Sequence, residues 1–87
     1  MKEKEVTVVN RAGIHTRPAA MIVKLAAKFR SDIFLIRDGF SINAKSIIGV
    51  MTLAAEQGAK ITLKTDGEDE EQALQEVSDL FNTGFNE

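Results

Sequence analysis

Apolar and polar residues alternate without a break in KITLKT, residues 60–65. In a strand, this alternation places Ile61 and Leu63 on one face and Lys60, Thr62 and Lys64 on the other. A sheet that contains such a strand has a single apolar face, so helices must cover that face and leave the other in solvent. Three further strands are predicted at residues 5–10 (EVTVVN), 32–36 (DIFLI) and 40–43 (FSIN), and the Asp-Gly pair between the last two is typical of a tight hairpin.

Three other segments repeat their apolar residues with the period of an α-helix. The first runs from Pro18, and the last spans residues 66–85, where the leading acidic residues suit a helix N-terminus. Between them, residues 46–58 predict a short helix with Ser46 as its N-cap and Gly58 as its terminator. The order βαββαβα predicts an α+β open-faced sandwich, in which three helices cover one face of a four-stranded antiparallel sheet. The apolar stripes of the first and last helices comprise Ala19, Ile22, Val23, Ala26, Phe29, Ala73, Leu74, Val77, Leu80 and Phe81.

The length and composition exclude several kinds of protein and of site. The 87 residues allow one domain, residues 1–87. There is no cysteine and only one histidine, which excludes disulfides and thiolate metal sites, and we expect no metal and no cofactor. The first residues lack an apolar signal region, and no apolar run approaches the ~18 residues of a membrane span. We therefore expect a cytoplasmic protein without membrane insertion.

Charge is unevenly distributed along the chain. Residues 1–64 hold all 11 Lys and Arg and 5 acids, whereas residues 65–87 hold 8 acids and no base. Two interpretations remain open: a solvated acidic face on the last helix, or a basic body that meets acidic protein partners. Nucleic acid is not expected as a partner, because the bases are scattered, the net charge is −2 and there is no Tyr or Trp to stack on bases.

The single histidine lies just before the first predicted helix. Proline is favoured in a first helical turn, so Pro18 places the helix start at about Thr16 or Arg17 and His15 at or before the N-cap. Unpaired N–H groups and the helix dipole make such a helix start an anion site, to which Arg17 adds a guanidinium fork. A neutral imidazole here is a nucleophile. The residues alone leave a second interpretation open, in which His15 is an incidental cap and Arg17 a surface charge.

Two motifs identify a family. GIHTRPAA (13–20) and NAKSIIGVM (43–51), with the spacing between them, resemble the signatures of HPr, the histidine-containing phosphocarrier family of the bacterial phosphoenolpyruvate-dependent phosphotransferase system. The resemblance covers the whole chain and implies the strand order 1-4-2-3. It also implies that Nδ1 of His15 accepts a phosphoryl group from phosphorylated Enzyme I and passes it to Enzyme IIA domains. Arg17 and the backbone N–H groups of Thr16 and Arg17 would hold that group. Such a chain is a carrier with a phosphohistidine intermediate rather than a free-standing enzyme.

The second motif implies regulation at Ser46. In the family, this serine is the target of HPr kinase/phosphorylase, and a transcriptional regulator is a further partner; a role as helix N-cap would by itself account for a serine here. Phosphate at this helix start would add negative charge without unfolding the helix. A regulatory paralogue lacks the active histidine, which this chain retains as His15.

The second helix also carries a candidate docking surface. The resemblance favours a patch of Ile47, Ile48 and Met51 beside the histidine loop, whereas Val50 and Leu53 are the better core candidates. In the alternative interpretation, all five side chains lie in the core. On the first helix, Ala20 and Ala27 would leave a flat platform with Lys24 as its basic rim, and Met suits a surface that must fit several partners.

Two functions remain to be compared. The first is a phosphocarrier, expected to be a monomer, with His15 as the acceptor. The alternative is a regulatory binding module, in catabolite repression or nitrogen-branch signalling, that acts mainly through docking. The stretch LFNTGFNE (80–87) resembles the nitrogen-branch member NPr, so the sequence leaves the sugar and nitrogen branches open.

Overall fold

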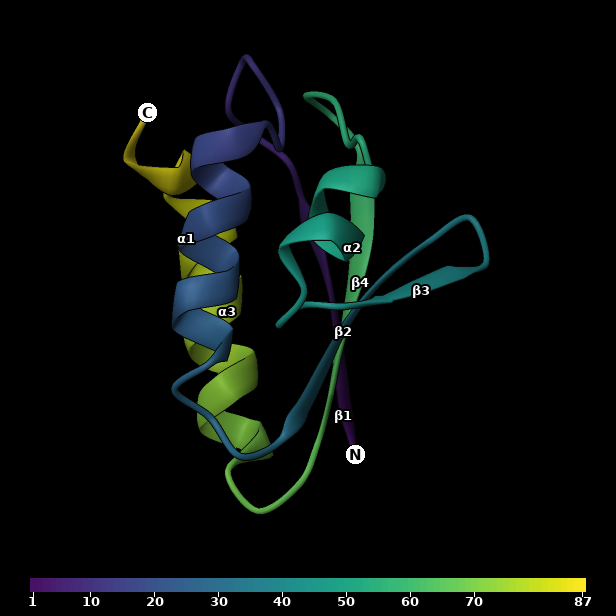
Figure 1. Ribbon diagram of the computed structural model, residues 1–87, viewed down its shortest axis with the longest axis vertical. Coiled ribbons are helices and arrows are strands. Elements are labelled where there is room, and N and C mark those ends of the chain that lie inside the picture. Colours follow the sequence, from purple (N-terminus) through teal and green to yellow (C-terminus); the bar gives the residue numbers. More distant parts are fainter.

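The computed structural model describes residues 1–87, and its sheet has the predicted topology. Four antiparallel strands lie in the order β1-β4-β2-β3, and α1 and α3 run side by side along one face (Figure 1). The short α2 packs against α1, and the C-terminal end of the chain lies beside the start of α1 (Figure 1). The α+β open-faced sandwich is thus confirmed. The elements are β1 Lys2–Thr7, α1 Thr16–Ala26, β2 Asp32–Arg37, β3 Phe40–Asn43, α2 Ile47–Thr52, β4 Lys60–Asp66, α3 Glu70–Asn82 and a 3-10 turn Gly84–Asn86.

The alternation in β4 produces the single apolar face. Ile61 and Leu63 are fully buried, while Lys60 is exposed. Leu35 of β2 lies opposite Leu63 in the register and is buried with it, and Val6 of β1 lies opposite Ile61. These side chains form the sheet side of one hydrophobic core, and the helices cover that core. The predicted apolar stripes of the two long helices are confirmed as the helical side of this core. Its buried members are Ala19, Ile22, Ala26, Phe29, Ala73, Val77 and Phe81, and the partly buried Val23, Leu74 and Leu80 pack against the core.

The predicted end of the second helix was wrong. We expected it to continue to Gly58, but α2 ends at Thr52, and Ala54 adopts a left-handed φ of 48°. The carbonyl of Ala55 accepts a hydrogen bond from the N–H of Ile14 at 2.8 Å, so this segment is held by the loop before α1 instead of by its own helix. The predicted N-cap is confirmed, because the Ser46 hydroxyl accepts a hydrogen bond from the Gly49 N–H at 3.1 Å.

The first strand is also displaced from its predicted position. It spans residues 2–7 instead of 5–10, so its first four residues are the charged stretch KEKE. As an edge strand, β1 pairs only with β4, and charges are tolerated there because most of these side chains reach solvent. Val8 continues the contact beyond the strand, since its N–H donates to the Ala59 carbonyl at 2.9 Å and its carbonyl accepts from the Gly58 N–H at 2.7 Å.

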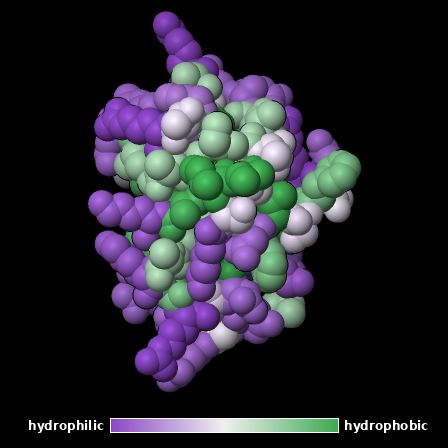
Figure 2. All heavy atoms as spheres, in the orientation of Figure 1, coloured by the Kyte–Doolittle hydropathy of each residue, from purple (hydrophilic) through white to green (hydrophobic).

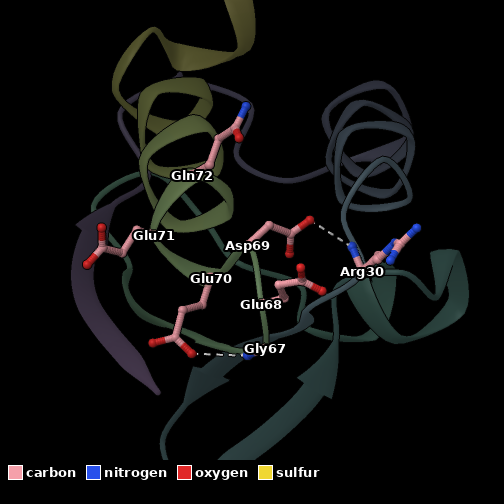
Figure 3. Close-up of a pocket in the computed structure, with 7 residues that line it drawn as sticks. All are labelled: Arg30, Gly67, Glu68, Asp69, Glu70, Glu71 and Gln72. Atoms are coloured by element: carbon pink, nitrogen blue, oxygen red, sulfur yellow. Dashed lines mark hydrogen bonds between the residues drawn. The ribbon is translucent and has the colours of Figure 1, made fainter.

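At the end of the molecule opposite the start of α1, acidic side chains at the start of α3 accept hydrogen bonds from the neighbouring loops (Figure 1 and Figure 3). Asp69 accepts hydrogen bonds from the Arg30 N–H at 3.0 Å, from the Ser31 N–H at 2.9 Å and from the Ser31 hydroxyl. The Ser31 hydroxyl, followed by the Arg30 N–H, lowers the pKa of Asp69 to about 2. Glu70 accepts from the Gly67 N–H at 3.1 Å and from the Met1 ammonium at 2.8 Å, and these bonds, the ammonium first, lower the pKa of Glu70. Part of the acidic charge of residues 65–87 is therefore structural.

Candidate functional site around His15

His15 is the N-cap residue of α1, as predicted. Its backbone is extended, with φ −97° and ψ −162°, and its carbonyl accepts the N–H of Ala19 at 2.9 Å to begin the helix. The side chain is 44% exposed. The imidazole therefore stands in solvent at the helix start, where another protein can reach it.

Asn10 and Gly13 shape the loop that presents the histidine. Asn10 is buried, and its Nδ2 donates to the Gly13 carbonyl at 2.7 Å. Gly13 has φ +70°, and a Cβ added there would lie 2.3 Å from the carbonyl oxygen of Ala55. The loop and the segment after α2 thus approach so closely that only glycine fits, and the Ile14–Ala55 hydrogen bond fixes them together.

The first turn of α1 has donors available for an anion. Thr16 and Arg17 are the first helical residues and are exposed, and no side chain caps the helix. Backbone N–H groups in this position have no intrahelical acceptor. Arg17 forms no ion pair within the chain. The structure therefore brings His15, Thr16 and Arg17 together at one helix start, where the backbone N–H groups of Thr16 and Arg17 have no acceptor within the helix.

Glu87 is a further site residue, which the sequence interpretation missed. Nε2 of His15 lies 3.0 Å from Oε2 and 3.3 Å from Oε1 of this carboxylate. Asn10 Nδ2 donates to Oε1 of Glu87 at 3.0 Å. The hydrogen bond from Asn10, then the one from His15, with the charges of His15 and Arg17, lowers the pKa of Glu87. No local pattern reveals this contact, since 72 positions separate the two residues.

The apolar residues of α2 divide between surface and core. Ile47, Ile48 and Met51 are exposed to 40%, 74% and 44%, whereas Val50 is fully buried and Leu53 packs against the core. The alternative in which all five lie in the core is therefore wrong. Figure 2 shows a concentrated apolar cluster over α2 at the centre of this face. On the adjoining helix α1, the three predicted platform residues are exposed as well: Ala20, Lys24 and Ala27.

Known proteins resemble this chain over its full length. A family model described as "PTS HPr component phosphorylation site" matches residues 2–83. The phosphocarrier protein HPr of Xylella fastidiosa is 49% identical over 87 residues, which are 100% of this chain and 98% of that protein. The structure of HPr-C-His from Thermoanaerobacter tengcongensis has a TM-score of 0.96 and 42% identity, and the match covers 100% of this chain and 98% of that one.

Dimers occur among the similar solved structures. An HPr dimer from Thermoanaerobacter tengcongensis also matches, with a TM-score of 0.80, 42% identity and full coverage of both chains, so the expected monomer is not confirmed. No helix here combines the length and apolar composition that crossing a bilayer requires. The family itself is not in doubt, since the model match and the relatives agree with the two motifs, the sheet order and the exposed histidine. The chain belongs to the HPr family, the phosphocarrier proteins of the phosphotransferase system.

Proposed function

We propose that His15 is the phosphoryl acceptor of this phosphocarrier and that Nδ1 is the reacting atom. The observation that supports this most directly is the placement of the ring: Nε2 faces Glu87 at 3.0 Å, which leaves the Nδ1 lone pair as the free nucleophile. In the step, this lone pair forms a bond to phosphorus while the bond between phosphorus and Enzyme I breaks, and its electrons stay with Enzyme I. The same exchange then delivers the group to an Enzyme IIA domain.

The start of α1 is proposed to stabilise the transferred group. The N–H groups of Thr16 and Arg17 have no acceptor within their helix, and the helix dipole favours negative charge there. The Arg17 guanidinium supplies a charge-assisted fork that matches phosphoryl oxygens. Because the chemistry of phosphoryl transfer consists mostly of positioning and charge stabilisation, these groups are suited to hold the phosphoryl oxygens.

Partner docking is proposed for the surface made by the exposed faces of α1 and α2. Ile47, Ile48 and Met51 supply apolar contact, and the flexible Met side chain suits a surface that meets Enzyme I and several Enzyme IIA domains in turn. Ala20 and Ala27 allow close approach beside Lys24, which would attract acidic partners. The proposed carrier is a single cytoplasmic domain, residues 1–87, that acts as a monomer because this surface must be free for each partner.

Ser46 is proposed as the regulatory site. Its hydroxyl caps α2 and is half-buried directly before Ile47, so phosphate there would add a charge of about −1.5 to −2 within the docking surface. The helix start tolerates an anion, so HPr kinase/phosphorylase would change docking instead of folding. This position also supports the second candidate function, a regulatory module of catabolite repression or nitrogen-branch signalling that binds a transcriptional regulator.

Incubation with phosphoenolpyruvate and a cognate Enzyme I tests the proposal. Intact-mass spectrometry should detect one acid-labile phosphoryl group on the wild-type chain. His15→Ala should accept none and should retain its thermal unfolding transition, because the side chain stands in solvent. A phosphorylated His15→Ala variant would exclude His15 as the acceptor, and a wild-type chain that accepts nothing would favour the regulatory module.

A further inference from the structure

The contact between Glu87 and His15 has a chemical consequence for both directions of transfer. We propose that Glu87 is a positioning residue that keeps a proton on Nε2 of His15, so that Nδ1 attacks as the nucleophile and the ring departs as neutral imidazole when the phosphoryl group moves on. The proposal rests on the proposed function, because it concerns the proton of the same ring.

Two hydrogen bonds to the Glu87 carboxylate assign the proton. An ionised carboxylate only accepts hydrogen bonds, so at 3.0 Å from Oε2 the Nε2 atom must be the donor. The second carboxylate oxygen, Oε1, is occupied by the Asn10 amide at 3.0 Å, so the carboxylate is held from both sides. The lowered pKa of Glu87 agrees with an ionised group in this place. Arg17, at the first turn of α1, is the other charge that acts on it.

The chain carries Glu87 to this place by an unusual route. Three consecutive residues after α3, Gly84, Phe85 and Asn86, have φ values of 63°, 57° and 60°. A left-handed backbone is uncommon for a bulky residue such as phenylalanine. Phe85 is nevertheless fully buried, and its ring meets that of Phe81 edge to face with 5.1 Å between centroids. The burial of Phe85 holds the left-handed turn in place, and the turn brings Glu87 back to the start of α1.

Asn10 joins this turn to the histidine loop. One nitrogen, Nδ2, donates both to the Gly13 carbonyl at 2.7 Å and to Glu87 at 3.0 Å. Asn10 is 6% exposed, so its side chain is a fixed support. Glu87 and the loop that carries His15 are therefore positioned by the same side chain, which is the arrangement expected of a residue that orients the imidazole.

The proton on Nε2 decides the charge of the imidazole ring when the P–Nδ1 bond forms and when it breaks. When the Nδ1 lone pair binds phosphorus, the ring with its Nε2 proton becomes cationic, and the Glu87 carboxylate stabilises that charge. When the group leaves for Enzyme IIA, the electrons of the P–Nδ1 bond return to the ring. With Nε2 protonated, the departing group is neutral imidazole; without that proton it would be imidazolate, a much poorer leaving group.

The test replaces Glu87 by Gln, which has a single oxygen for the two donors, His15 and Asn10. His15 is the only histidine, so ¹⁵N-labelling of histidine gives one pair of imidazole signals, from which the proton position is read. Wild type should carry the proton on Nε2, and E87Q should show a mixture of both tautomers. Transfer from phosphorylated His15 to an Enzyme IIA domain, measured in a single turnover at saturation, should be about threefold to tenfold slower, since a charge-assisted hydrogen bond is roughly twice as strong as a neutral one.

Matched variants and two readouts make the outcome decisive. Glu71→Gln removes one carboxylate at the other end of α3, where Glu71 meets only Lys2 at 3.3 Å, and should match wild type in both readouts. Glu87→Ala removes the acceptor altogether and should follow E87Q. A wild-type tautomer in both Glu87 variants, or wild-type transfer rates in both, would overturn the proposal. A wild-type chain that accepts no phosphoryl group would instead refute the proposed function, and the tautomer measurement on the unmodified protein would still decide the role of Glu87.

Discussion

Gly13→Ala should destabilise the protein much more than alanine at another glycine with the same backbone conformation. At φ +70°, an alanine has the strain of a left-handed residue, about 1–2 kcal/mol, partly offset by about 0.4–1 kcal/mol from a less flexible unfolded chain. The new Cβ would also lie 2.3 Å from the Ala55 carbonyl oxygen, a backbone atom that cannot turn aside like a side chain.

The larger loss of unfolding free energy comes from the hydrogen bond between the Ile14 N–H and the Ala55 carbonyl, which the new Cβ would break. If the Ala55 carbonyl moves, the N–H of Ile14 loses its 2.8 Å hydrogen bond within a buried residue, which costs about 1–3 kcal/mol. The free energy of unfolding should then fall by about 2–4 kcal/mol in total. For a domain of this size, the unfolding midpoint should fall by roughly 10–25 °C.

Gly39→Ala is the matched control. Gly39 has φ +84°, but nothing lies within 4 Å of a Cβ added there. This variant should lose only about 0.5–1.5 kcal/mol of unfolding free energy, from strain alone. Thermal and urea unfolding of both variants measure the difference, and phosphoryl acceptance by Gly13→Ala should also slow because the loop of His15 moves. Equal destabilisation of the two variants would refute the steric argument.

Three further predictions follow from the site and the fold. Arg17→Ala should slow single-turnover transfer about tenfold while Enzyme I affinity stays unchanged, because one charge-assisted bond to the phosphoryl group is lost; transfer at the wild-type rate would remove Arg17 from the site. Ser46→Asp should fold normally, since aspartate is a good N-cap, yet it should accept the phosphoryl group from Enzyme I more slowly than wild type does. This difference from wild type should be larger at low salt than at high salt. Equal rates of the variant and wild type at low salt would leave Ser46 as a cap only. Asp69 stabilises the fold above its unfolded pKa of 3.8, and this contribution is lost as pH falls through about 2. The stability gap between wild type and Asp69→Asn, measured by urea unfolding, should therefore narrow as pH falls across that window, and a constant gap would contradict the assigned cause.

Local periodicity predicted those parts of the fold that depend on one buried face. Ile61 and Leu63 in β4, and Ala73, Val77 and Phe81 in α3, are buried as their spacing indicated. The prediction was wrong where a distant partner decides the structure. The end of α2 depends on the bond between Ala55 and Ile14, and alternation alone does not reveal that bond.

The site was predictable to the same extent. His15, Thr16 and Arg17 are contiguous, so a helix start with a proline in its first turn was enough to place them together. Glu87 was not predictable, because its approach depends on a left-handed turn at Phe85 that the sequence does not suggest for a bulky residue. Glycine and asparagine on either side favour such a turn, but they do not say which side chain it delivers.

His15 lies outside the larger hollows of the surface, so the free protein does not shield its imidazole ring from water. The larger hollows lie away from His15: one is bordered by Arg30 and the first turn of α3 (Figure 3), and another by Arg37, Phe40 and Leu53. His15 itself is exposed, so water reaches the ring in the free protein. Charge stabilisation at the phosphoryl group is much stronger where water is excluded. In the proposed docking mode, a partner seated on the apolar patch of Ile47, Ile48 and Met51 would exclude this water, and efficient transfer would then depend on correct docking.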